Sequence, residues 1–390
     1  MNTQKPFEID SHMIEFDATV LSCEKIGKNY AIVLDKTAFF PNGGGQPSDT
    51  GYIGDIEVID VQIVEGNILH FSSSPIRLKE VHCKINWPER FRRMQNHSGE
   101  HIFSGIIHKM TGFDNVGFHM SEHSMTVDFS GEIPEEQLKK AEYEANSAIY
   151  KNLPVISYYP SSQERKNMDY RSKLELKNDV RIVEIEGIDC CACCAPHVKR
   201  TGEIGIIKVL SHMRHRGGTR VFLTCGRDAF NDYSEKNDSA QNIGELLSAK
   251  KSDIYDAVKK LNEDLLSARY EISCLKQKYA SCIANGIQKS QNNIYIFEEE
   301  LCIEDLRLIV NECREKTDKI ILAFSGNDVS GYRYVIYSKN FDVLKIAKDL
   351  NQNFNGKGGG KNGMIMGNLF ADKSQIISFF DQAIAMSAYR

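Results

Sequence analysis

Residues 90–102 read RFRRMQNHSGEHI, and the pattern of the chain changes at this stretch. Before it, residues 13–90 alternate short β-rich runs with Gly, Asn, Pro and Asp turns, which favours a small β-barrel or sandwich. From Arg90 onward the spacing predicts a helix that carries His97 and His101, followed by a mixture of strands and helices. We therefore predict an α+β fold class.

Two further segments are expected after this α+β region. Between Phe230 and Ala284 there is no proline, and apolar residues recur at heptad spacing. This spacing predicts a long helical segment, either a two-chain coiled coil or a helical hairpin inside one chain. The last hundred residues return to an α/β pattern. The predicted segments are a β-barrel domain with a glycine-rich loop at 1–89, an α+β domain at 90–228, a helical coiled-coil or hairpin segment at 229–288, and a C-terminal α/β domain at 289–390.

The composition of the 390-residue chain is that of a globular protein, with 41% hydrophobic and 26% charged residues. No apolar run approaches the roughly 20 residues that a membrane helix needs, so no membrane partner is expected. The N-terminus shows no apolar segment behind a basic start, which favours a cytoplasmic location. The eleven cysteines are then expected to be reduced thiols or metal ligands.

His97 and His101 are four residues apart in the predicted helix. Both side chains therefore project from one face and can bind one ion. The pair alone is a weak signal, because histidines at this spacing also serve packing.

The segment DCCACCAPH at residues 189–197 strengthens the case for a metal. A thiolate and an imidazole from this segment would complete a set of three histidines and one cysteine, which zinc accepts. Such a set leaves the ion open to a water molecule and permits solvent activation. The spacing does not decide which cysteine binds. A closed zinc knot that uses Cys190-x-x-Cys193 or Cys191-x-x-Cys194 is the alternative.

A glycine-rich loop, FFPNGGGQPSDTG, occupies residues 39–51. Gly43, Gly44 and Gly45 permit close approach of the backbone to a ligand. Gln46 would then hydrogen-bond a ribose, an ester or a bound water. A tight turn of the barrel is the alternative, and the loop alone names no substrate.

The net charge of −5 means that any nucleic-acid surface must be local. Basic stretches adjoin the chemical motifs at residues 90–93 and 212–220, and a glycine-rich loop at 356–363 places two lysines near bare backbone amides. Solvated charged faces and a flexible linker are the alternatives. The candidate RNA-binding residues are Arg214, Arg216, Arg220, Lys357 and Lys361.

Four motifs, taken in order, carry a resemblance to a known family. They are F-P-x-G-G-G-Q-P-x-D-x-G at 40–51, N-H-S-G-E-H at 96–101, C-x-x-x-H-V at 193–198 and T-G-E-I-G at 201–205. They resemble the editing domain of alanyl-tRNA synthetase, and the chain resembles the long form of its free-standing relatives, the AlaX-type trans-editing proteins. The helical segment and the glycine-rich C-terminal segment are similar to the C-terminal region of the synthetase, so the match spans the chain.

The resemblance implies an aminoacyl-tRNA deacylase that removes serine, and also glycine, from wrongly charged tRNA(Ala). It implies zinc as cofactor, held by His97, His101, Cys193 and His197, within an editing domain at 90–228. The synthetase usually has Cys-Gly-Gly-Thr-His where this chain has CCAPH, which leaves Cys194 as a rival thiol. Mischarged tRNA(Ala) is the expected partner. The domain at 289–390 is expected to bind tRNA, and a homodimer is expected to form through the helical segment and this domain.

We predict catalytic roles for the four zinc ligands and for Gln46. Substrate contacts are predicted for Gly43–Gln46 and Asp189, with a serine-discriminating pocket along residues 117–126. Two rival functions remain. His97-x-x-Glu100-His101 also fits the His-x-x-Glu-His pattern of some zinc peptidases, with Glu100 as general base. The other rival is a non-catalytic RNA-binding adaptor in which zinc only stabilises the fold.

Overall fold

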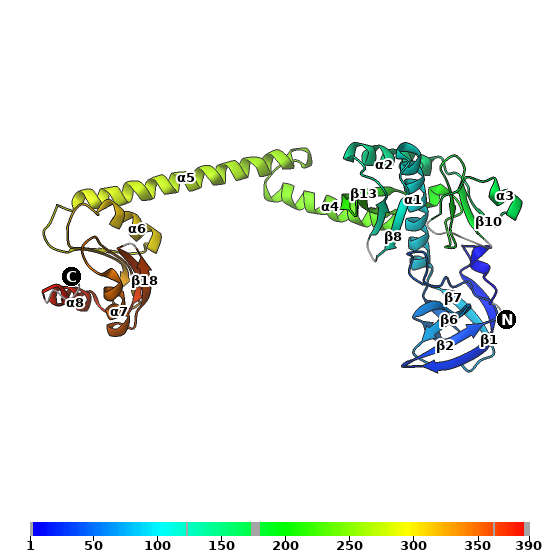
Figure 1. Cartoon of the computed structure of the whole chain (residues 1–390), viewed down its shortest axis with the longest axis horizontal. Coiled ribbons are helices and arrows are strands. Elements are labelled where there is room, and N and C mark those ends of the chain that lie inside the picture. The colour runs from blue at the N-terminus through cyan, green and yellow to red at the C-terminus, as the bar shows by residue number, and fades with distance from the viewer. Residues whose placement is uncertain (1–2, 122–123, 173–179, 362, 386–390) are drawn as a thin grey trace. The chain divides into compact units, whose positions relative to one another are not determined.

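The computed structural model describes residues 3–121, 124–172, 180–361 and 363–385. The chain divides into two compact units, Met1–Asn242 and Ile243–Arg390 (Figure 1). Among the described residues, none of the helices combines the length and the apolar character that a membrane span requires. All four predicted zinc ligands lie in the first unit.

The first unit begins with a seven-stranded antiparallel sheet in the order β4-β3-β7-β1-β2-β6-β5. Strands β4 and β6 also contact each other, so the sheet is nearly closed around buried side chains such as Ile32, Phe39 and Val81. This agrees with the expected small barrel. The strands are β1 (Glu15–Ile26), β2 (Asn29–Leu34), β3 (Gly51–Ile53), β4 (Ile56–Val58), β5 (Asp60–Val64), β6 (Asn67–Ser72) and β7 (Glu80–Ile85).

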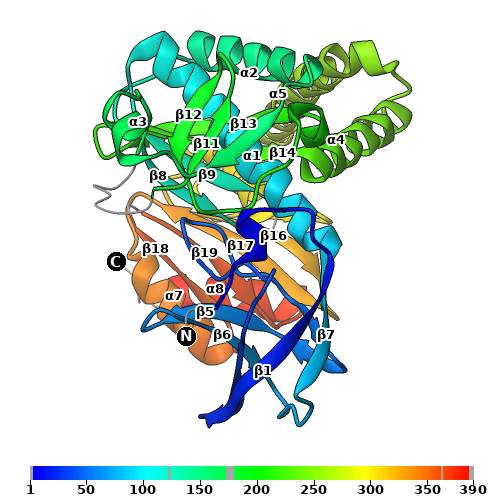
Figure 2. The ribbon, with the colours of Figure 1, turned by 90° about the vertical axis from the view of Figure 1, so that its right-hand side faces the viewer.

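Helix α1 (Trp87–Thr111) follows the barrel directly and forms the centre of the remaining part of this unit. Proline lies in its first turn, and Gly112 ends it in a left-handed conformation, which are common start and stop signals. Its middle, from Met94 to Ile107, is buried. Helix α2 (Glu135–Tyr150) packs along it (Figure 2).

Two small antiparallel sheets complete the packing around α1, in the orders β10-β11-β12 and β13-β14-β9-β8. Strand β12 carries the first cysteines of the cluster, and Gly99 allows α1 to approach Cys225 on β14. The elements are β8 (Asn115–Met120), β9 (Met125–Phe129), β10 (Val155–Tyr158), α3 (Ser162–Lys166), β11 (Ile182–Ile185), β12 (Asp189–Ala192), β13 (Ile207–His215) and β14 (Gly218–Cys225).

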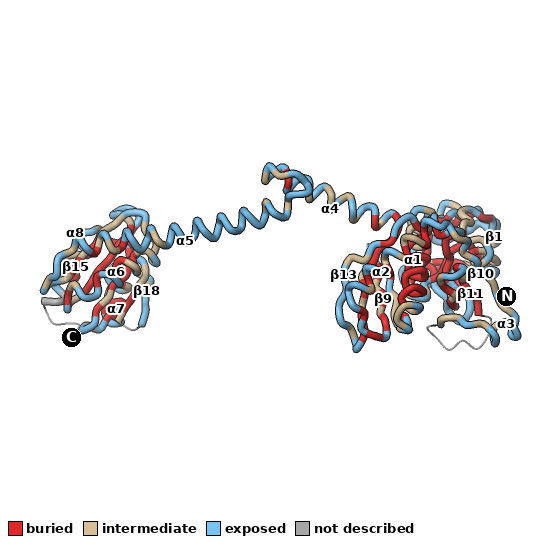
Figure 3. The backbone as a smooth tube through the Cα atoms, turned by 90° about the horizontal axis from the view of Figure 1, so that it is seen from above, coloured by how far each residue is buried: buried red, intermediate tan, exposed pale blue. Residues whose placement is uncertain are grey.

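The heptad segment forms two helices, α4 (Gly226–Leu246) and α5 (Ile254–Gly286). Near the end of α5, Ala280 and Ala284 are buried against the C-terminal sheet. Figure 3 shows that α5 is otherwise largely exposed, and its apolar heptad residues, among them Leu261 and Leu265, are exposed too. The predicted helical segment is therefore present as two helices, and α5 carries an apolar stripe that is exposed.

The second unit contains a five-stranded sheet in the order β15-β16-β17-β19-β18, with β15 parallel to β16 and the other pairs antiparallel. Helices α7 and α8 cover one face, and α6 with the end of α5 covers part of the other. The elements are β15 (Ile294–Glu298), α6 (Ile303–Glu312), β16 (Ile320–Asn327), β17 (Gly331–Ser338), α7 (Val343–Asn353), β18 (Lys357–Lys361), β19 (Met364–Leu369) and α8 (Lys373–Ala385).

The glycine-rich segment at 356–363 differs from the predicted loop, because Lys357–Lys361 forms the edge strand β18. A side chain at Gly358 would collide with the Tyr334 hydroxyl, and one at Gly360 with the carbonyl of Met364. The glycines thus permit close strand packing. Asn362, within the same predicted loop, lies outside the described residues.

Candidate metal centre

Helix α1 and the turn after β12 bring the four predicted ligands together. One nitrogen from each of His97, His101 and His197 and the sulfur of Cys193 all lie within 4.8 Å of one another. The Cys193 Sγ lies 3.3 Å from Nε2 of His197 and 3.6 Å from Nε2 of His97. Two stretches about ninety residues apart in the sequence therefore meet at one point.

His101 is oriented by a buried carboxylate. Its Nδ1 donates to Oδ2 of Asp189 at 3.0 Å, and Arg171 donates to both oxygens of the same carboxylate at 2.7 and 3.0 Å. A carboxylate on the far ring nitrogen fixes the tautomer of a metal-binding histidine. Asp189, for which a substrate contact is predicted, lies against His101 and Arg171.

The other two imidazoles are held in the same manner. His97 Nδ1 donates to Oε1 of Gln46 at 2.7 Å, and His197 Nδ1 lies 3.0 Å from Oγ of Ser98. Because each ring uses its Nδ1 for a protein partner, the three Nε2 atoms are left to face the cysteine. This arrangement is the one that a bound metal ion requires.

The electrostatics of the group favour a cation. Burial raises the pKa of the Cys193 thiol, but the neighbouring imidazoles of His97 and His197 and the hydrogen bonds from His101 and His197 outweigh burial and hold this pKa well below its usual value. Burial lowers the pKa of His197 to about 3, which keeps its imidazole neutral. Burial also disfavours charged His101, yet the hydrogen bond to Asp189 raises its pKa to about 10. The Cys193 thiolate therefore attracts positive charge to the centre, which a proton on His101 supplies and a bound metal ion would supply in its place.

The donor set fits zinc, since imidazole nitrogens and a thiolate sulfur are ligands that this ion accepts. A pocket of about 360 Å³ reaches the group, and His97, His101 and Cys193 are part of its lining, together with Gly44 of the glycine-rich loop. The group is thus accessible to a ligand from one side.

The remaining thiols of the cluster take different positions. Cys191 forms a second close group with His101 and Asp189, while Cys190 is half-buried and Cys194 is exposed. In the described part of the chain, neither Cys190 nor Cys194 belongs to a group of three metal-binding side chains. Cys191 is therefore the neighbouring thiol that the described structure groups with one of the predicted ligands, His101.

The glycine-rich loop reaches the metal centre through Gln46. Gly43 and Gln46 exchange backbone hydrogen bonds at 3.0 and 3.2 Å, which closes a tight turn, and Gly44 and Gly45 have positive φ angles of 60° and 82°. A side chain at Gly45 would collide with the carbonyl of Phe118. Gln46 is fully buried, and its Nε2 has no hydrogen-bond partner among the described residues. One donor is thus left at the centre.

A buried ion pair connects this loop to α1. Arg90 donates from Nε to the Asp49 oxygens at 2.9 and 3.0 Å, and its Nη2 donates to the same carboxylate and to the carbonyl of Ala38. Asp49 also accepts the backbone N–H of Phe40 at 2.6 Å. Arg90, taken from the sequence as part of a basic surface, is therefore a structural contact.

Two of the three predicted RNA-binding arginines have acidic partners. Arg214 pairs with Glu132 at 2.6 Å, and Arg220 pairs with Asp128 at 2.6 and 2.7 Å. Arg216 lies in the turn between β13 and β14 with a positive φ of 48°. The positive charge of this hairpin is therefore partly neutralised.

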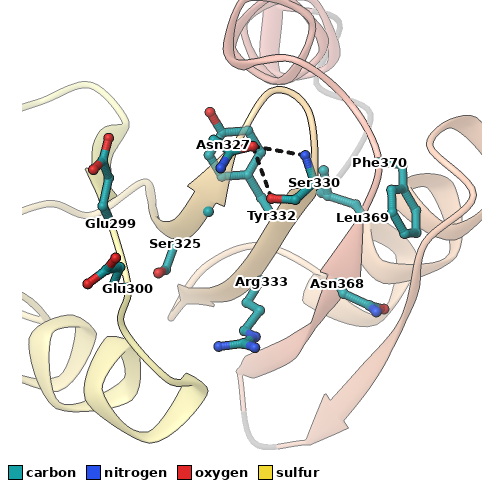
Figure 4. Close-up of a pocket in the computed structure, with 12 residues that line it drawn as sticks. Glu299, Glu300, Ser325, Asn327, Ser330, Tyr332, Arg333, Asn368, Leu369 and Phe370 are labelled. Carbon is teal, nitrogen blue, oxygen red and sulfur yellow. Dashed lines mark hydrogen bonds between the residues drawn. The ribbon is translucent and has the colours of Figure 1, made fainter.

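Lys357 and Lys361 are exposed on β18. Strand pairing places Lys357 opposite Asn368, which in turn lies opposite Arg333. Asn368 and Arg333 line a polar pocket of about 420 Å³ at one end of the sheet, with Glu299 on its opposite wall (Figure 4). No histidine or cysteine is among the described residues that line this pocket.

Glu100 forms hydrogen bonds inside the protein and is not one of the grouped metal-binding side chains. It is buried and accepts hydrogen bonds from Ser104, at 2.6 Å, and from Asn115. It does not belong to the close group of metal-binding side chains. This placement gives no support to the peptidase reading of His-x-x-Glu-His.

The predicted serine-discriminating region, residues 117–126, covers parts of β8 and β9. The Phe118 ring lies 4.9 Å from that of His97, so β8 borders the metal centre. Residues 122–123 of this region lie outside the described residues. The contacts of Arg171 with Asp189 and of Ser98 with His197 were not predicted from the sequence. Arg171 belongs to no motif, and the only signal for Ser98 is that it follows His97.

Two family models match parts of the chain. The model described as threonyl and alanyl tRNA synthetase second additional domain matches residues 180–222, and the model described as tRNA synthetases class II (A) matches residues 8–88. The first match contains Cys193 and His197, and the second contains the glycine-rich loop.

Curated relatives match along nearly the whole chain. Alanyl-tRNA editing protein AlaX-L of Pyrococcus horikoshii is 28% identical over 96% of this chain and 96% of its own length. Alanyl-tRNA editing protein Aarsd1 of Danio rerio is 25% identical over 92% of both chains. An alanine–tRNA ligase of Methanococcus maripaludis is 29% identical over 93% of this chain, which spans 41% of that ligase.

Among solved structures, the C-Ala domain of Aquifex aeolicus alanyl-tRNA synthetase matches 23% of this chain and 87% of its own, at 20% identity and a TM-score of 0.21. That score is too low to establish a shared fold. The sequence relatives, in contrast, confirm the resemblance drawn from the motifs. The chain is similar in sequence to alanyl-tRNA editing proteins over nearly its whole length.

Proposed function

We propose that the protein is an aminoacyl-tRNA deacylase that edits tRNA(Ala) by hydrolysing the ester of a wrongly attached serine or glycine. The observation that carries this proposal is the open His₃Cys group, in a chain related over 96% of its length to an alanyl-tRNA editing protein. Its homologues include free-standing editing proteins from an archaeon and a fish.

The proposed cofactor is zinc, held by His97, His101, Cys193 and His197. When bound at such a centre, zinc supplies Lewis-acid polarisation and activates water for ester hydrolysis. The protein contributes fixed ring orientations through Gln46, Asp189 and Ser98, so little reorganisation is needed for binding.

Gln46 is the proposed substrate-orienting residue at the centre. Its Oε1 is used by His97, and its buried Nε2 is left as a donor toward a bound ester or the ribose beside it. The tight turn at Gly43–Gln46 gives the backbone close access to the 3′ end of the RNA. A donor positioned in a buried site can stabilise charge that develops on an ester oxygen.

Preference for serine over alanine would come from hydrogen bonds to the additional hydroxyl group. A pocket whose polar groups stay unpaired with alanine discriminates more strongly than one that only adds apolar contact. We place this pocket along the described parts of residues 117–126, next to the His97 ring.

We further propose that the C-terminal unit binds the body of the tRNA and that α5 forms a homodimer. Lys357 and Lys361 offer exposed charges on the edge strand, and Arg216 adds charge in the first unit. The exposed apolar stripe of α5 includes Leu261 and Leu265 and has the heptad spacing that a second helix would cover. Contacts to phosphates predict tRNA affinity that falls steeply with salt.

The test is incubation of the zinc-loaded protein with Ser-, Gly- and Ala-tRNA(Ala), with and without a chelator, while the released amino acid is measured. We expect release of serine and glycine, little release of alanine, and loss of activity after chelation. Cys194→Ser serves as a matched control because this thiol is exposed and outside the ligand group. Equal release of alanine, or activity that survives complete removal of metal, contradicts the proposal.

A further inference from the structure

The pocket beside the metal centre has a polar wall that the proposed chemistry does not use. Besides three of the four metal-binding side chains, its lining includes Lys5, Glu8, Tyr159 and Arg181. Lys5 and Glu8 belong to the segment before β1, whereas Tyr159 and Arg181 belong to the α+β part of the unit. The pocket is therefore built by two distant parts of the chain.

Arg181 is the most buried charged side chain of this wall, with 5% of its surface exposed. Its Nη1 donates to the carbonyls of Cys193 and Ala195 at 3.1 and 2.9 Å, and its Nη2 donates to the carbonyl of Glu8 at 3.3 Å. Its Nε is buried and has no hydrogen-bond partner among the described residues. A buried donor without a partner is costly, so Arg181 has a donor available for a ligand.

The charges of the pocket favour an anion. Lys5 and Arg181 contribute two positive charges, while Glu8 contributes one negative charge that is shared with Tyr159, which donates to it at 2.7 Å, and with Lys5 at 3.6 Å. At the inner end of the pocket, the charge of a bound divalent metal ion would outweigh the negative charge of the Cys193 thiolate. An ammonium group would be repelled by this wall, whereas a phosphate would be attracted to it.

We propose that Lys5 and Arg181 bind the phosphate that links the last two nucleotides of the tRNA, an inference that rests on the proposed deacylase function. In an aminoacyl-tRNA the ester lies on the terminal ribose, and the 5′-phosphate of the same nucleotide is the nearest anion. Arg181 donates to the backbone carbonyl of Cys193, so this wall adjoins the metal centre within the same pocket. Arginine and lysine are the side chains that bind phosphate most strongly.

The test uses two non-hydrolysable probes, 3′-deoxy-3′-(L-serylamino)adenosine and its 5′-phosphate, and the zinc-loaded full chain. Calorimetric titration gives the ratio of their dissociation constants. We expect the phosphate to tighten binding to the wild type by about tenfold. The ratio should fall towards one in Lys5→Ala and in Arg181→Met. Lys139→Ala, an exposed lysine on α2 that pairs with Glu135, should leave the ratio unchanged.

Arg181 also supports the turn that carries Cys193, so zinc content is measured in each variant, and Lys5→Ala keeps the test valid if Arg181→Met loses metal. Equal wild-type affinities for the two probes, no binding of either probe, or an unchanged ratio in Lys5→Ala each overturn the inference. Serine release from Ser-tRNA(Ala) is measured separately. Release without a phosphate effect refutes the inference alone, and absence of release refutes the deacylase function.

Discussion

Replacing Arg90 by methionine should destabilise the first unit strongly. Arg90 and Asp49 are 0% and 1% exposed, and Arg90→Met leaves the Asp49 carboxylate buried without its cation. Loss of one partner of a buried ion pair costs about 3–5 kcal/mol. The carbonyls of Ser11 and Ala38 also lose their guanidinium donor. We therefore expect the free energy of unfolding to fall by about 3–5 kcal/mol.

The double variant Arg90→Met/Asp49→Leu measures how much of the destabilisation comes from the unpaired Asp49 charge. It removes the stranded carboxylate but leaves the Phe40 N–H without its acceptor, which costs about 1–3 kcal/mol. The double variant should therefore be more stable than Arg90→Met alone, although the second change removes another native side chain.

Urea unfolding of the zinc-loaded protein, followed by tryptophan fluorescence, measures both variants. Trp87 is the single tryptophan. It begins α1, and its ring lies 5.3 Å from that of Phe91, so it reports on the junction that Arg90 stabilises. A loss below about 1 kcal/mol in Arg90→Met, or a double variant less stable than the single one, would refute the reasoning.

Three further predictions concern the metal centre, the barrel and α5. Asp189→Asn should weaken zinc affinity by about 10–100-fold, measured by chelator competition; unchanged affinity would remove Asp189 from the support of the site. Burial lowers the pKa of His70 from 6.5 to about 4. The neutral His70 side chain therefore contributes its full stabilisation of the fold above pH 6.5, and this contribution is lost as pH falls towards 4. Between pH 7 and pH 5 the free energy of unfolding should fall by about 2 kcal/mol more in the wild type than in His70→Gln. An equal fall in the two proteins, measured by urea unfolding at both pH values, would contradict this. Leu261→Lys/Leu265→Lys should convert a wild-type dimer into monomers in analytical ultracentrifugation, whereas a monomeric wild type would exclude the proposed homodimer.

Local patterns predicted the elements that depend on short-range chemistry. The helix expected to carry His97 and His101 is α1, which has a proline in its first turn and ends before Gly112. The β-rich residues 13–90 form the strands β1 to β7, and the last hundred residues contain both strands and helices, as their pattern predicts. These segments have periodic apolar residues and clear capping signals, so little tertiary information was needed.

Contacts between distant parts of the chain were harder to predict. The run from Arg90 to Arg93 is typical of a solvated basic face, and only the folded chain shows that Arg90 pairs with Asp49 in the interior. Arg171 has no motif of its own and acquires its role because β12 places Asp189 beside it. The glycines at 358 and 360 indicated a loop, because the crowding that requires them arises from strands that pair with them in the sheet.

The most direct measurement of the central claim determines zinc content and serine release together in three proteins: the wild type, Cys193→Ser and Cys194→Ser. We expect one zinc per chain and rapid release of serine from Ser-tRNA(Ala) in the wild type and in Cys194→Ser, because Cys194 lies outside the ligand group. Cys193→Ser should lose both. Full metal content and activity in Cys193→Ser, or loss of both in Cys194→Ser, would contradict the assigned centre.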